Sequence, residues 1–186
     1  MVSLQPPVCE FGKKAPDFSL QGVDQQQWTL KKCAGERGLL VIFMSNHCPY
    51  VKAIRKKLVR DTRDLQLLGI NSVAIMPNDT VAYPEDSFEN IVRTSNEFNF
   101  PFPYLLDETQ EVARAYDAVC TPDFFGYNAD LELQYRGRLD AAGPKSDDDT
   151  KERELFEAMK QVAESGRGPE HQIPSMGCSI KWRETV

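Results

Sequence analysis

An unbroken apolar run, Gly38 to Met44 (GLLVIFM), constrains the fold of this chain more than any other feature. A continuous run of this length is typical of a strand that is buried on both faces of a sheet. Ser-Asn-His-Cys-Pro-Tyr follows, and apolar residues then recur at helical spacing. Pro49 suits the first turn of a helix and Gly69 suits its end. The sequence therefore predicts a buried strand that turns directly into a long amphipathic helix, with Cys48 at the turn.

The position of Cys48 predicts reactivity. At a helix start, unpaired N–H groups and the helix dipole stabilise an anion, and the thiolate is the reactive form of cysteine. We therefore expect Cys48 to be a redox-active or nucleophilic cysteine on an α/β scaffold. The alternative is an inert buried cysteine, because cysteine is among the most often buried residue types.

The rest of the chain alternates between predicted strands and helices. Further strands are expected within residues 11–20 and at 28–30, 70–76, 105–106, 124–127 and 131–135, and helices at 87–99, 108–116 and 150–164. Asp86 or Ser87 is expected to cap the helix over 87–99, and Asp107 the helix over 108–116. The order predicts one α/β domain over residues 1–186 with a central mixed sheet flanked by helices, an N-terminal β extension and a C-terminal arm over 165–186.

Composition excludes several classes of protein. A length of 186 residues suits one domain, and a net charge of −6 argues against a general nucleic-acid binder. No secretory signal is evident and the apolar runs are too short to span a bilayer, so we expect a cytoplasmic protein without membrane association. The scattered cysteines show no C-x-x-C spacing, which argues against a disulfide framework or a zinc site. No metal or cofactor is expected, and Cys9 and Cys33 are expected to be structural.

Five motifs carry a resemblance that spans nearly the whole chain: APDFSL (15–20), SNHCPYV (45–51), CTPDFF (120–125), YRGRLD (135–140) and GCSIKW (177–182). Together they resemble the thioredoxin-like proteins grouped with alkyl hydroperoxide reductase and thiol-specific antioxidant. The resemblance implies a thioredoxin-like fold. It also implies that Pro122 has a cis peptide bond and lies against Cys48, and that Thr121 presents its backbone to an extended substrate.

Position 45 bears on the mechanism. Members of this group often carry Cys-Asn-His-Cys, but Ser45 rules out a disulfide between positions 45 and 48. Ser-x-x-Cys resembles the peroxiredoxin pattern, although Val41 replaces its proline. In that pattern the hydroxyl bonds the peroxide or the thiolate, and the cysteine becomes a sulfenic acid. Peroxiredoxins also place an arginine near the thiolate, and Arg138 is the best candidate.

Two cysteines are candidates for resolving an oxidised Cys48. Cys120 lies two residues before Pro122, and we prefer it slightly as the nearer neighbour. Cys178 lies in a tail that contains glycine and proline, and a flexible arm would bring its thiol to Cys48. Both alternatives stay open.

The functional hypothesis is a thiol-based oxidoreductase, an antioxidant in cell redox homeostasis. Cys48 attacks a peroxide or a disulfide, and Ser45 stabilises its thiolate. Asn46 and His47 shape the approach, and Thr121 with Pro122 forms the opposite wall. An external thiol, thioredoxin or glutathione, reduces the product, and a homodimer through a sheet edge is compatible with the fold. The alternatives are a protein thiol–disulfide oxidoreductase that works through a mixed disulfide, and a binding module without turnover.

Two charged clusters are expected to be solvated. The basic residues of the helix after Cys48 form one surface, and the acidic run at 147–149 forms a loop that leads into a helix cap. The basic surface consists of Lys52, Arg55, Lys56, Lys57 and Arg60.

Overall fold

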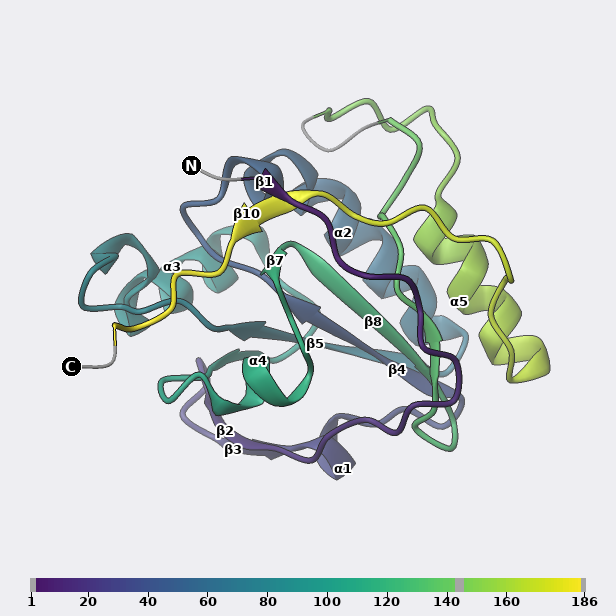
Figure 1. The fold of residues 1–186 in the computed structure, drawn as a ribbon, viewed down its shortest axis with the longest axis horizontal. Coiled ribbons are helices and arrows are strands. Elements are labelled where there is room, and N and C mark those ends of the chain that lie inside the picture. The colour runs from purple at the N-terminus through teal and green to yellow at the C-terminus, as the bar shows by residue number, and fades with distance from the viewer. Residues whose placement is uncertain (1–2, 143–145, 185–186) are drawn as a thin grey trace.

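A seven-stranded mixed sheet forms the centre of the protein (Figure 1). The computed structural model describes residues 3–142 and 146–184. The strand order is β3-β2-β6-β5-β4-β8-β9. Strands β4, β5 and β6 run parallel, β8 is antiparallel to β4, and β9 is antiparallel to β8. The strands are β2 (Ser19–Gly22), β3 (Gln27–Thr29), β4 (Gly38–Phe43), β5 (Ile70–Met76), β6 (Tyr104–Leu106), β8 (Asp123–Asn128) and β9 (Leu133–Tyr135). The expected mixed sheet is confirmed.

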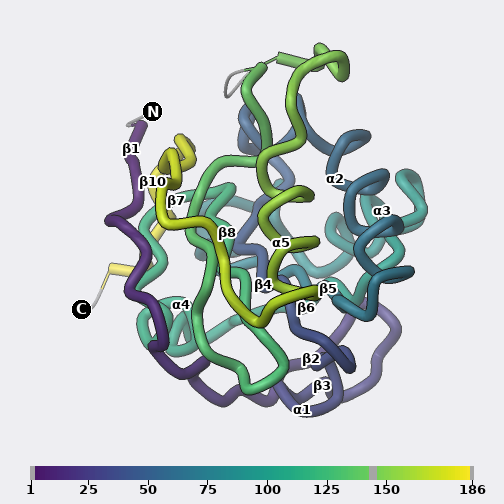
Figure 2. Tube along the Cα trace, turned by 90° about the vertical axis from the view of Figure 1, so that its right-hand side faces the viewer, coloured from purple at the N-terminus to yellow at the C-terminus, as the bar shows by residue number. Residues whose placement is uncertain are grey.

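The apolar run forms β4, an interior strand of the sheet, and helices cover both of its faces. Side chains alternate between the two faces of a strand. Leu40 and Ile42 of β4 pack in one core with α2 (Pro49–Leu67), α3 (Phe88–Phe98) and α5 (Glu154–Ser165). Leu39 and Val41 pack in the other core with α1 (Leu30–Cys33) and α4 (Glu111–Ala115). Figures 1 and 2 show these helices on opposite sides of the sheet.

Two helix starts differ from the sequence prediction. Helix α4 begins at Glu111 rather than at 108, and Gln110 is its N-cap residue. Asp107 still accepts a hydrogen bond from the Ala113 N–H at 2.8 Å, but from outside the helix. Helix α5 begins at Glu154 rather than at 150, so the acidic run does not lead directly into its cap. Ser87 caps α3 as expected, and accepts from the Asn90 N–H.

The basic surface is only partly solvated. Lys57 is buried and forms an ion pair with the buried Asp140 at 2.5 Å. Arg153, just before α5, forms ion pairs with Asp61 and Asp64 of α2. These contacts fix α5 against α2. Residues 143–145, shortly before the predicted acidic loop at 147–149, lie outside the described residues.

A second, three-stranded sheet contradicts the prediction of a flexible C-terminal arm. Strand β10 (Gly177–Ser179) lies between β1 (Ser3–Leu4) and β7 (Cys120–Thr121), antiparallel to both. The N- and C-terminal segments therefore run side by side (Figures 1 and 2). No helix within residues 3–142 and 146–184 has the length and hydropathy needed to cross a membrane.

Candidate active site

Cys48 occupies the turn between β4 and α2, as the sequence predicts. It is the N-cap residue of α2, Pro49 is the first helical residue, and the Cys48 side chain is 0% exposed. Its sulfur lies 3.0 Å from the carbonyl oxygen of Thr121 and 3.0 Å from the sulfur of Cys178. The reactive candidate is therefore buried against β7 and β10.

The peptide bond between Thr121 and Pro122 is cis, as the resemblance implies. It lies between β7 and β8, at the end of the sheet where β4 meets α2. The carbonyl oxygen of Thr121 accepts from the Cys48 thiol, so the two segments meet directly.

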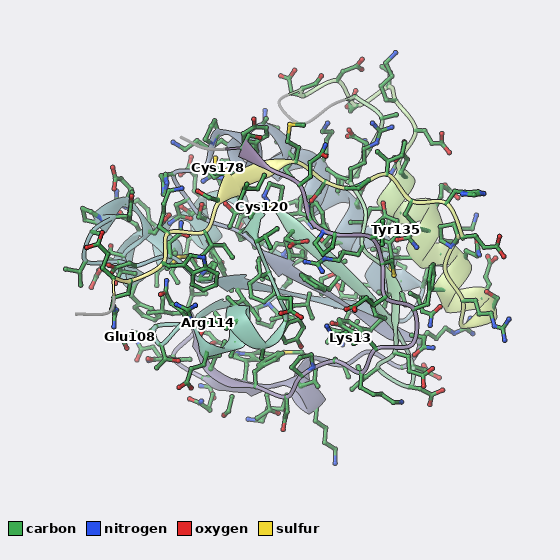
Figure 3. All side chains as sticks on the ribbon, viewed as in Figure 1. Lys13, Glu108, Arg114, Cys120, Tyr135 and Cys178 are labelled. Carbon is green, nitrogen blue, oxygen red and sulfur yellow. The ribbon has the colours of Figure 1, made fainter. Side chains whose placement is uncertain are left out.

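Strand register explains why Cys178, and not Cys120, contacts Cys48. Neighbouring residues of a strand point to opposite faces, whereas directly opposed residues of paired strands share a face. Cys178 is paired with Thr121, whose hydroxyl faces Ser45 of the Cys48 turn. Cys120 comes from the same sheet (Figure 3), but its sulfur lies 3.5 Å from the carbonyl oxygen of Pro122. Cys178, and not Cys120 as expected, is therefore the nearer neighbour of Cys48.

Burial separates the other thiols from this site. Burial raises the pKa of Cys120 well above its ordinary value. Burial also raises the pKa of Cys9 to about 11 and that of Cys33 to about 12, and Cys33 lies in the core on the opposite face of the sheet. These thiols are poor nucleophiles, because the thiolate is the reactive form.

Ser45 and Asn46 hold the turn together. The Ser45 hydroxyl lies 3.2 Å from the Thr121 hydroxyl, so its hydrogen bond joins the two walls of the site. The Asn46 N–H donates to Asp86 at 2.7 Å, and the Asn46 carbonyl accepts from Arg55 at 2.8 Å. The roles expected for Ser45 and Asn46 toward thiolate or substrate stay predictions.

His47 is held by a buried carboxylate that the sequence reading placed only as a helix cap. The ring Nδ1 of His47 lies 2.6 Å from Oδ2 of Asp86, whose side chain is 0% exposed. Asp86 also accepts from the side chain of Asn78. Burial raises the pKa of Asp86, but the hydrogen bonds from His47, Asn78 and the Asn46 N–H outweigh it, so this pKa lies below its usual range. The sequence signal that could have pointed to this contact is the presence of an acidic residue, Asp86, in the segment after β5.

The cation beside the Cys48 turn is Arg55, not Arg138. Arg138 forms a two-pronged ion pair with Glu154 of α5. Arg55 lies two helical turns after Cys48 on α2, and its guanidinium packs over the ring of Phe98 at 4.9 Å. Its buried Nε has no hydrogen-bond partner among the described residues. Burial lowers the pKa of Arg55.

Comparison with known proteins identifies the family. Residues 11–141 match the AhpC/TSA family. The chain belongs to the AhpC/TSA family. A search of curated proteins finds no significant match. No group of histidine, cysteine and acidic side chains within residues 3–142 and 146–184 is arranged to hold a metal ion.

Solved structures extend this result. The chain is 42% identical to an uncharacterized conserved protein from Geobacillus kaustophilus, with a TM-score of 0.93 over 100% of this chain and 99% of that one. It is 36% identical to a hypothetical protein from Sinorhizobium meliloti, with a TM-score of 0.89 over 97% and 99%. The thioredoxin domain of a thiol-disulfide oxidoreductase from Bacteroides vulgatus shares 13% identity and a TM-score of 0.63 over 82% and 97%. The thioredoxin-like fold is confirmed, and membership in the AhpC/TSA family supports a thiol-based redox function.

Proposed function

We propose that this protein is a peroxide-reducing thiol oxidoreductase in which Cys48 is the nucleophile and Cys178 is the resolving thiol. The observation that carries the proposal is the contact of 3.0 Å between the two sulfurs. A disulfide bond is about 2.05 Å long, so its formation requires the sulfurs to approach by about 1 Å. Both thiols are buried, which leaves the oxidised Cys48 facing Cys178 rather than solvent.

The cycle has two chemical steps. The Cys48 thiolate attacks one peroxide oxygen, the O–O bond breaks, and the leaving oxygen takes a proton, which gives a sulfenic acid and an alcohol or water. The Cys178 sulfur then attacks the sulfenic sulfur, the hydroxyl leaves as water with the Cys178 proton, and a disulfide forms. Two electrons and two protons from an external reductant, either the dithiol of thioredoxin or two molecules of glutathione, restore both thiols.

Strand β10 favours a small oxidant over a protein disulfide. The resemblance implies that Thr121 presents its backbone to an extended substrate, but Thr121 is already paired with Cys178. An extended protein substrate has to displace β10, whereas a peroxide does not need this strand position. The Cys178 thiol that β10 supplies also takes the place of the second thiol that Ser45 removes from the usual motif. The alternative, disulfide exchange on a protein, remains the second candidate because a cysteine at the start of a helix is equally suited to attack a disulfide sulfur.

A coupled turnover assay tests the proposal. Hydrogen peroxide consumption is followed with thioredoxin, its reductase and NADPH, and separately with glutathione. We expect turnover by the unchanged protein and by the control Cys33→Ser, and none by Cys48→Ser. In the assay with thioredoxin, Cys178→Ser should complete only the first step, the oxidation of Cys48 by peroxide. Failure to consume peroxide, together with reduction of a protein disulfide, would instead support the second candidate.

A further inference from the structure

The contact between Cys48 and Cys178 depends on how the chain is held beyond β10. Strand β10 has only three residues and pairs through two of them with each neighbouring strand. The C-terminal segment continues past β10 (Figure 1), and residues 181–183 bond to the loop after β5 and to the N-cap residue of α4. Two buried carboxamide side chains, Asn78 and Gln110, bind its backbone there, and we call this pair the amide clamp.

Gln110 uses both ends of its amide group in the clamp. Its Nε2 donates to the carbonyl oxygens of Pro77 at 2.7 Å and Lys181 at 2.9 Å, and its Oε1 accepts from the Arg183 N–H at 2.8 Å. The backbone of Gln110 has a φ of 64°, in the left-handed region that residues other than glycine rarely adopt. Such a conformation persists only where surrounding contacts fix it. The three hydrogen bonds of the side chain are contacts of this kind.

Asn78 joins the C-terminal segment to the turn that carries Cys48. Its Oδ1 accepts from the Lys181 N–H at 2.9 Å, and its Nδ2 donates to Asp86 at 2.7 Å. Asp86 in turn accepts at 2.7 Å from the N–H of Asn46, two residues before Cys48. A chain of three hydrogen bonds therefore connects the turn with the nucleophile to the segment with the resolving thiol.

We propose that Asn78 and Gln110 are positioning residues that hold the thiol of Cys178 against Cys48. This inference rests on the proposed function. The clamp contacts only main-chain N–H and C=O groups of the segment, so it fixes the path of the chain rather than one side chain. With the clamp closed, Cys178 already contacts the sulfur that peroxide oxidises, and the disulfide forms without a rearrangement of the segment.

The same clamp controls reduction of the disulfide. Cys48 and Cys178 are 0% and 1% exposed, so an external dithiol reaches neither sulfur while the clamp is closed. When the clamp opens, a thiolate of the dithiol attacks the Cys178 sulfur, the S–S bond breaks, and Cys48 leaves as a thiolate that takes up a proton. The second thiol of the dithiol then attacks the mixed disulfide and releases Cys178, so two electrons and two protons pass to the protein. A weaker clamp therefore slows disulfide formation and speeds reduction.

The test measures three rates in Gln110→Ala and Gln110→Asn. Asparagine tolerates the left-handed backbone but is one methylene shorter, so it preserves the turn while its amide falls short of the segment. After one equivalent of hydrogen peroxide, rapid quenching and mass spectrometry follow the Cys48 sulfenic acid and the disulfide. The oxidised protein is then mixed with excess dithiothreitol, and the loss of the disulfide is timed.

We expect both variants to oxidise Cys48 at the unchanged rate. They should form the disulfide about tenfold more slowly and lose it about tenfold faster, because a hydrogen bond lost from a buried group is worth about this factor. Asn128→Ala is the matched control. Asn128 is also a buried carboxamide that bonds three main-chain groups, but it is paired with Gly38, at the other end of β4 from the Cys48 turn.

The outcomes separate the two proposals. If Cys48 of the unchanged protein is oxidised no faster than Cys33, the proposed function fails. If the unchanged protein forms the Cys48–Cys178 disulfide and the folded Gln110 variants form and lose it at the unchanged rates, only the clamp is overturned. Equal changes in Asn128→Ala also overturn the clamp, because a general loss of stability then accounts for them. Circular dichroism of each variant establishes that it is folded.

Discussion

Replacing Gly177 by alanine moves the resolving thiol without removing it. A Cβ at position 177 would lie 2.2 Å from the carbonyl oxygen and 2.5 Å from the carbonyl carbon of Thr121, whereas ordinary contacts begin at 3.4 Å. Both obstacles are backbone atoms beside the cis bond, so β10 has to give way. We expect β10 to move by roughly 1 Å, at a cost of about 1–3 kcal/mol for an overpacked site.

That displacement should separate the two steps of the cycle. The sulfurs of Cys48 and Cys178 are 3.0 Å apart, and a shift of roughly 1 Å breaks their contact. Misplacement on this scale lowers reaction rates by about 10²-fold. Disulfide formation in Gly177→Ala should slow by this factor, while the first oxidation of Cys48 continues.

Rapid-quench mass spectrometry with a sulfenic-acid trap follows both species after one equivalent of hydrogen peroxide. In Gly177→Ala, trapped sulfenic acid on Cys48 should accumulate before the disulfide appears. Ser179→Ala, in the same strand, is the matched control, because Ser179 is paired with Cys120 and its hydroxyl accepts from Lys181. Disulfide formation at the unchanged rate in folded Gly177→Ala would refute the argument that β10 places the resolving thiol.

Three further predictions follow from the site and its supports. Cys178→Ser should stop at the Cys48 sulfenic acid whereas Cys120→Ser should still form the disulfide, and a trapped acid in the second variant instead of the first would reverse the assignment. Because the pKa of Asp86 is lowered on folding, its contribution to stability is present above about pH 4 and is lost as pH falls. Urea unfolding should therefore show a shallower acid loss in Asp86→Asn, and identical slopes would contradict this. Arg136→Met leaves the buried Asp123 without its ion-pair partner and should cost about 3–5 kcal/mol in the same assay, while a loss below about 1 kcal/mol would mean that the pair is as weak as an exposed one.

The sequence predicted the parts of the fold that depend on local pattern. The run from Gly38 became β4, and Pro49 opens α2, because a doubly buried strand and an amphipathic helix each leave a periodic signal. The cis bond before Pro122 followed from the resemblance. These features placed Cys48 correctly at the turn.

The features that were missed depend on long-range contacts. Strand β10 has three residues, Gly-Cys-Ser, too short for any periodicity, and it exists because β1 and β7 lie on either side of it. The burial of Asp86 depends on donors from other segments of the chain. Arg55 was within reach of sequence reasoning, because a residue seven positions after Cys48 returns to the same side of a helix after two turns.

The most direct test of the account is to identify the partner of Cys48 in the oxidised protein. The fully reduced protein is treated briefly with one equivalent of hydrogen peroxide, blocked and mapped by mass spectrometry without reduction. The account predicts rapid loss of two hydrogens and a peptide pair joined through Cys48 and Cys178. A link between Cys48 and Cys120, or oxidation of Cys48 no faster than that of Cys9 and Cys33, would contradict it.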